Sequence, residues 1–147
     1  MAIVLTLSNH FKFSVVSKAI DLAAAGDMIK VLLMDASFAF DPDSMAVGAD
    51  VTGGSPEHQL PTSGGYTLNN KTLANQVVAE DDANNKAHFT CDDISWTATA
   101  GGFGPTGSAV LLDTTADVVI GCIDFGSDFT IPDGSVFQIT DIEIDLT

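Results

Sequence analysis

The sequence predicts a mainly β fold, a β-sandwich or jelly-roll-like single domain with one helix near its N-terminus. The length of 147 residues fits one domain, and 46% hydrophobic against 17% charged residues excludes intrinsic disorder. After residue 70, short apolar segments alternate with turn sequences rich in Gly, Asn and Asp. This spacing is typical of sandwiches and barrels and not of alternating strand and helix units, so we expect residues 1–147 to form one β domain.

The helix is expected at about residues 9–22. Ser8 or Asn9 can cap its first turn, because a short side-chain oxygen accepts a hydrogen bond from an otherwise unpaired backbone N–H. Gly26 stands where a left-handed residue would end the helix or a short extension of it. Between these signals, apolar residues recur at helical spacing as one stripe: Phe11, Val15, Val16, Ala19 and Ile20.

A strand and then a long loop region are expected after the helix. Residues 28–34 read MIKVLLM, whose length and apolar content indicate a mostly buried strand. Proline and glycine interrupt residues 36–70 repeatedly, which predicts a long loop region and not a second domain. Loops of this length are often functional or form an interaction surface, although a plain surface loop is the simpler expectation.

Short strands separated by turns are expected to make up the rest of the chain. Residues 73–80 and 87–91 should form a hairpin around the turn sequence DDANN. A Gly-rich turn is expected at 101–105, and further strands at 94–98, 108–112, 117–125, 129–131 and 136–146. Aromatic residues in these patterns are expected to be core, among them Phe89, Trp96, Phe125 and Phe137.

The charge of the chain limits its partners. Twenty acidic residues stand against five lysines and no arginine, a net charge of −15, and residues 87–147 contain no lysine. Such a surface repels phosphate backbones and anionic headgroups, so we expect no nucleic-acid and no membrane partner. No apolar run approaches the ~20 residues of a membrane helix.

The sequence contains no recognisable catalytic constellation. His10 falls at the start of the expected helix, His58 in the loop and His88 on the polar side of a strand. A nucleophile elbow, a P-loop and a His-Glu-x-x-His motif are all absent. We therefore predict that the protein is not an enzyme and has no catalytic residues and no cofactor.

Two Asp-Asp pairs, at 81–82 and 92–93, flank one expected strand and contain ligand types that calcium prefers. The pattern lacks the glycine and the terminal glutamate of an EF-hand, and Asx residues are ordinary in turns. We expect solvated turns and no metal site.

Cys91 and Cys122 fall in apolar strand segments and are predicted to be buried free thiols, with a disulfide as the alternative.

Short motifs occur in a fixed order over residues 9–147. They are NHFK (9–12), IDL (20–22), IKVLLMD (29–35), GGYT (64–67), KTLAN (71–75), DD (81–82) with Asn84, DDISWTA (92–98), GSAVL (107–111), IDFG (123–126) and DGS (133–135). In this order they resemble a family of small virion structural proteins encoded by tailed bacteriophages and prophages. Two features depart from the family pattern: LNN at 68–70 replaces a Gly-rich tripeptide, and an apolar extension, residues 1–7, precedes the helix.

The resemblance implies a structural component of the particle, in particular a capsid decoration (cement) protein that binds the major capsid protein. It further implies a homotrimer on the capsid surface of the virion, assembled in the host cytoplasm. The alternative is a tail- or head-fibre-associated adhesive module that binds host surface glycans. Sugar faces stack on aromatic rings, and this chain has a single tyrosine and a single tryptophan, the latter expected in the core, so glycan binding is not favoured.

The apolar N-terminal extension supplies the candidate interface residues, Ala2, Ile3, Val4, Leu5 and Leu7. Such a segment either adds a strand to the domain's own sheet or pairs with a neighbouring subunit through unpaired backbone groups. An internal strand is the simpler expectation, because an apolar start to a domain is usually core, and both alternatives stay open.

Overall fold

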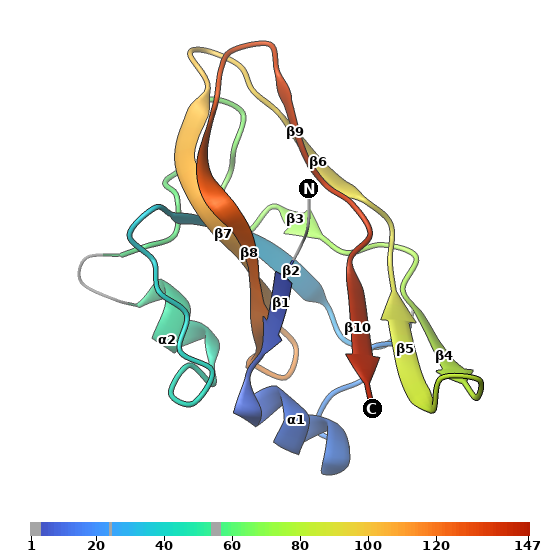
Figure 1. The fold of residues 1–147 in the computed structure, drawn as a ribbon. Coiled ribbons are helices and arrows are strands. Elements are labelled where there is room, and N and C mark those ends of the chain that lie inside the picture. The colour runs from blue at the N-terminus through green and yellow to red at the C-terminus, as the bar shows by residue number, and fades with distance from the viewer. Residues whose placement is uncertain (1–3, 24, 54–56) are drawn as a thin grey trace.

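An antiparallel five-stranded sheet runs through the centre of the computed structural model, which describes residues 4–23, 25–53 and 57–147 (Figure 1). Its order is β1-β8-β7-β2-β3, with bounds Val4–Leu7, Val118–Ile131, Phe103–Asp113, Ile29–Asp35 and Lys71–Thr72. A three-stranded sheet has the order β10-β5-β4, with bounds Glu143–Leu146, Lys86–Thr90 and Val77–Asp81. The remaining pair joins β6 (Ile94–Thr97) to β9 (Val136–Ile139).

The larger core lies between the five-stranded sheet and the two smaller sheets. It combines Leu33 and Leu111 of the central sheet with Phe89, Trp96 and Ile144 of the smaller ones, all at most 2% exposed. Strands take 45% and helices 9% of the described residues. The expected mainly β, sandwich-like fold is thereby confirmed, with two helices in place of one.

A second core covers the opposite face of the central sheet. Leu32, Met34 and Val110 are fully buried there, beneath Val51 of a short helix, α2 (Gly48–Thr52), and Phe38 of the preceding turn. Both faces of β2 are therefore covered, which explains why its residues 31–34 are continuously apolar. Residues 38–51 of the expected loop region supply this cover, so this part is not a plain surface loop.

Helix α2 was not expected from the sequence. Its five residues are too few for a helical period to show in the sequence. Its first turn is stabilised by the side chain of Asp50, a residue of the helix itself. The Asp50 carboxylate accepts hydrogen bonds from the backbone N–H groups of Ala46 and Val47, both at 2.9 Å. A carboxylate at the start of a helix is stabilising, and these bonds lower the pKa of Asp50.

Helix α1 spans Asn9–Val16 and is shorter than the expected 9–22. The capping prediction is confirmed, since the Ser8 hydroxyl accepts the N–H of Phe11 at 2.9 Å. The helix ends earlier because Lys18 takes a left-handed φ of 58°, with Ala19 N–H donating to the Ser14 carbonyl. The prediction that Gly26 takes a left-handed conformation is wrong. Glycine is required there because the chain passes close to Asp21: a Cβ at position 26 would lie 2.4 Å from the Asp21 carbonyl oxygen.

Two expected strand boundaries also need correction. The segments 117–125 and 129–131 are one strand, β8, because the three residues between them, 126–128, form a bulge and not a turn. The segment 136–146 is two strands, β9 and β10, separated at Asp141, whose φ is 54°. The expected hairpin is confirmed as β4 and β5, which pair from Asp81↔Lys86 onward.

Candidate functional site

The N-terminal segment forms an edge strand of the central sheet. Its described part, β1, pairs antiparallel with β8 from Val4↔Asp124 to Leu7↔Gly121, whereas Ala2 and Ile3 lie outside the described residues. The strand approaches β8 closely, since a Cβ on Gly121 would lie 2.4 Å from the Thr6 carbonyl oxygen. The segment therefore belongs, at least from Val4, to the domain's own sheet.

The two faces of β1 differ in burial. Leu5 and Leu7 are half-buried and pack against the larger core, whereas Val4 is 61% exposed. Among the residues described, β1 has a hydrogen-bonded neighbour on one side only, β8. An edge strand of this kind presents unpaired N–H and C=O groups that can accept a further strand.

A groove of about 340 Å³ runs along this edge. It lies between β1 and β10, the edge strand of the three-stranded sheet, and Asp141, Glu143 and Asp145 stand along one side of it. Its apolar lining comes from both sheets: Leu5, Leu7, Ile123, Ile142 and Ile144. The groove combines apolar surface with unpaired strand edges, two features to which extended segments of other proteins can add as strands.

A second hollow, of about 400 Å³, lies between the segment 35–40 and strands β7 and β8. Its lining includes Asp35, Asp124, Phe38 and Phe40. The Asp35 carboxylate accepts the N–H of Ser37 at 2.7 Å, and Asp124 accepts that of Gly126 at 2.8 Å. These carboxylates hold turns in place and do not converge on a common point.

Two of the three histidines pair with carboxylates at the surface. His58 Nδ1 lies 3.2 Å from Asp35 Oδ1, and His88 Nδ1 lies 2.5 Å from Asp145 Oδ1. Over the described part of the chain, neither imidazole is hydrogen-bonded to a hydroxyl or thiol that it could activate. The geometry of these pairs supplies no nucleophile and base.

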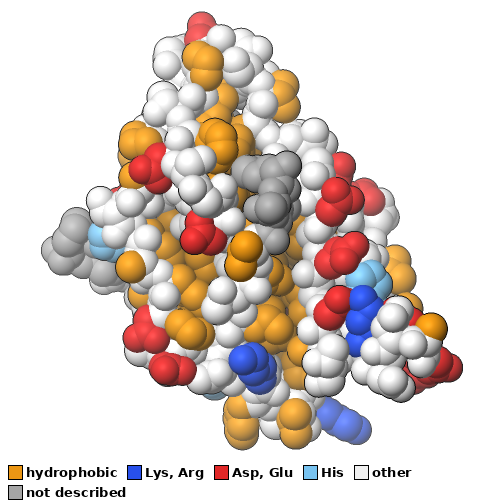
Figure 2. All heavy atoms as spheres, viewed as in Figure 1, with side chains coloured by type: hydrophobic (Ala, Val, Ile, Leu, Met, Phe, Trp, Pro, Cys, Tyr) orange, Lys and Arg blue, Asp and Glu red, His pale blue; other side chains and the backbone are white. Residues whose placement is uncertain are grey.

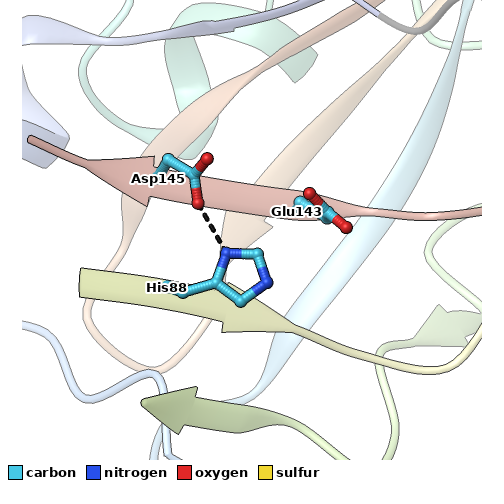
Figure 3. A group of neighbouring side chains, drawn as sticks. All are labelled: His88, Glu143 and Asp145. Atoms are coloured by element: carbon cyan, nitrogen blue, oxygen red, sulfur yellow. Dashed lines mark hydrogen bonds and ion pairs between the residues drawn. The ribbon is translucent and has the colours of Figure 1, made fainter. Parts of the chain in front are cut away.

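Among the residues that the structure describes, three potential metal ligands lie together: His88, Glu143 and Asp145, whose ligand atoms are all within 4.8 Å of one another (Figure 3). The β5–β10 register places His88 opposite Asp145, with Glu143 two residues away on the same face. Sequence reasoning missed this group because its members are far apart in the chain and only the strand register brings them together.

The same group is already partly neutralised by Lys86. The Lys86 ammonium lies 2.7 Å from Asp145 Oδ2 and is followed along the strand by His88. The bonds from Lys86 and then His88 lower the pKa of Asp145, and the Asp145 carboxylate raises the pKa of Lys86. A resident ammonium competes with a metal ion for the carboxylate, so the arrangement fits a surface ion-pair network.

The two Asp-Asp pairs stay apart, at opposite ends of β5. Asp81 accepts the Asn84 side-chain amide at 2.8 Å, and Asp92 accepts that of Asn75 at 2.6 Å. The Asp93 carboxylate accepts the N–H of Asp141 at 3.2 Å. Each of these acids thus organises a local turn or loop, and the pairs do not combine into one ligand set.

Both cysteines are free thiols, as predicted. Cys122 is buried in β8, whereas Cys91 is only half-buried, which corrects the expectation that both are buried. Burial raises the pKa of each thiol to about 11, with the charges of Asp92 and Asp93 adding to the effect at Cys91. Neither thiol is an activated nucleophile.

No family model, curated protein or solved structure matches the chain. Neither helix within the described ranges is long and apolar enough to cross a membrane. The packing of the two sheets forms the groove at the β1 edge, with its apolar lining and acidic side.

Proposed function

We propose that the protein is a structural component of a tailed-bacteriophage virion, a capsid decoration protein that binds the major capsid protein on the shell surface. The ordered motifs over residues 9–147 support this proposal. The structural observation that carries it is the N-terminal segment, which forms an edge strand beside an apolar groove. The proposed protein acts by binding and not by catalysis, and it uses no cofactor.

The charge of the molecule supports contact with a basic surface. A net charge of −15 repels nucleic acid and other acidic proteins, and it complements a basic patch on a shell protein. Complementary charge sets the register and speed of association more than its strength, so the apolar groove must supply much of the affinity. The proposed assembly is a homotrimer on the capsid, formed in the host cytoplasm.

The alternative, a fibre module that binds glycans, has less support. Tyr66 and Trp96, the single tyrosine and the single tryptophan, are each 1% exposed and pack against other rings in the core. They cannot stack on a sugar without unfolding their surroundings. Capsid decoration is therefore the function that we propose.

A direct test mixes the purified protein with shells assembled from the major capsid protein alone and measures cosedimentation. The proposal predicts saturable binding to intact shells. Binding should weaken as salt increases from about 0.05 to 0.5 M, because added salt screens the exposed charges. Failure of the protein to sediment with shells at low salt would overturn the proposal.

A further inference from the structure

Strand β10 has an open edge that faces β1 across the groove (Figure 1). Along its other edge β10 pairs with β5, from Glu143↔Thr90 to Leu146↔Ala87. Among the described residues no strand pairs with the open edge, so the sheet β10-β5-β4 ends at the groove. An edge of this kind can be extended by one more strand.

Side chains alternate along β10 between the two faces of its sheet. Ile142 and Ile144 are 2% exposed and point into the core, whereas Asp141, Glu143 and Asp145 are exposed. Figure 2 shows apolar side chains running down the middle of this face of the molecule, with acidic side chains gathered to the right of them. A strand added to β10 would thus meet apolar and acidic neighbours in turn.

We propose that the groove binds an extended segment of a partner protein, added as a strand to the open edge of β10, in which basic and apolar residues alternate. Residues opposite Glu143 and Asp145 would lie on the outer face and carry the basic side chains. Those opposite Ile144 would point inward, where Leu5 and Leu7 complete an apolar lining. This inference rests on the proposed function, since it makes the segment part of the major capsid protein.

A second copy of this chain does not fit the groove. Pairing of β10 with β10 across a two-fold axis would set the acidic residues of one copy against those of the other, which is destabilising. The chain has no arginine, and its lysines all precede residue 87, so β10 has none to offer. Within the described residues, moreover, Asp141 and Glu143 have no ion-pair partner. A partner that brings lysine or arginine satisfies this charge.

The test uses the full chain and an amidated octapeptide of alternating lysine and valine, with a glutamate–valine octapeptide as the charge control. Fluorescence anisotropy measures affinity, and amide hydrogen exchange shows where the peptide lies. The proposal predicts binding of the lysine–valine peptide alone and slower exchange of β10 amides. The amides of β4, at the other edge of the same sheet, should be unaffected.

Two double variants separate the groove from the overall charge. The first, Asp141→Asn with Glu143→Gln, removes two charges beside the groove, and asparagine tolerates the left-handed φ at position 141. The control, Asp82→Asn with Asp133→Asn, removes two exposed charges in turns elsewhere. We expect the first to weaken peptide binding about fivefold and the control by less than about twofold.

Three results would overturn the inference. Equal weakening by both double variants would mean attraction to net charge alone. Protection at α1 or at β4 in place of β10 would put the peptide elsewhere. Protection of β10 that grows with protein concentration, without peptide, would mean that a second copy fills the groove.

The outcomes for the inference and for the proposed function are distinguishable. If the Asp141→Asn/Glu143→Gln variant binds shells as tightly as the unchanged protein does, the groove assignment is wrong and the decoration function stands. If the unchanged protein does not bind shells but still binds the lysine–valine peptide at β10, the proposed function is wrong and the groove assignment stands.

Discussion

Ser8 connects helix α1 to the central sheet with a single hydroxyl. Its Oγ accepts the N–H of Phe11 and donates to the backbone carbonyl of Val119 in β8. The residue is fully buried, so neither of its two partners can form a hydrogen bond with water in its place. One side chain thereby caps the helix and fixes its position against the sheet.

We expect Ser8→Ala to lower the free energy of unfolding by about 1–2 kcal/mol, because it removes a cap and leaves a buried carbonyl unpaired. Chemical denaturation measures the change. Ser95→Ala, at an exposed position of β6, is the matched control and should alter stability by less than about 0.5 kcal/mol. Equal effects of the two substitutions would contradict the role given to Ser8.

Asp113 is fully buried at the end of β7, and burial raises its pKa, with Asp27 adding to the effect. A carboxyl whose pKa is higher in the folded state destabilises that state once it ionises, and the cost disappears when the pH falls below the unfolded pKa. Asp113→Asn keeps an oxygen for the N–H groups of Thr115 and Ala116. It should raise the melting temperature at pH 7.

The gain from Asp113→Asn should shrink as the pH is lowered and vanish below about pH 4, where the unchanged protein carries a neutral Asp113 in both states. Thermal melts across this range check the prediction. Asp133→Asn, an exposed control in a turn, removes the same charge without the burial. A control that stabilises as strongly at pH 7 would assign the effect to net charge.

The two thiols should react slowly in the folded protein. With a pKa of about 11, roughly one thiol in a thousand is ionised at pH 8. Titration with a disulfide reagent should show little reaction until denaturant is added and then release both thiols, with Cys91 reacting before Cys122. A native mass lower by two hydrogens would instead establish a disulfide.

Strand β1 packs against the larger core and also forms one edge of the central sheet. Leu7 packs on the larger core while Val4, at the other end of the strand, is exposed. We expect Leu7→Ala to cost about 1–3 kcal/mol of stability and Val4→Ser less than about 0.5 kcal/mol, measured by denaturation. The opposite order would mean that the packing of β1 against the core is not as described.

Deletion of residues 2–7 should lower the melting temperature and abolish shell binding together, because it removes β1 from the sheet and one wall of the groove. Unchanged melting with lost binding would mean that the segment serves only as an interaction arm. Circular dichroism of the truncated chain separates a loss of stability from a loss of fold.

At the scale of elements, the sequence predicts what local chemistry determines. The cap at Ser8 and the hairpin between Asp81 and Lys86 follow from residue types a few positions apart. Helix α2 and the bulge around Gly126 do not, because tertiary contacts decide whether a short Gly- and Asp-containing segment turns, coils or continues a strand. The groove is harder still to predict from the sequence, because Leu5 and Ile144 come to line it only when two separate sheets pack together.

At the scale of the whole molecule, an acidic β-sandwich-like domain presents a groove between the edges of two sheets. Open strand edges with apolar surroundings are aggregation hazards, and a high net charge opposes nonspecific association between copies of the chain. The same charge favours the basic partner segment that we propose for the groove.

Quantitative mass spectrometry of purified virions tests the central claim, capsid decoration, most directly. The measurement is the copy number of this protein relative to the major capsid protein of the same particles. Decoration predicts about one copy for each copy of the shell protein, as repeated binding to a symmetric shell requires. A few copies per particle would indicate a tail or fibre component, and absence of the protein from particles would contradict a structural role in the virion.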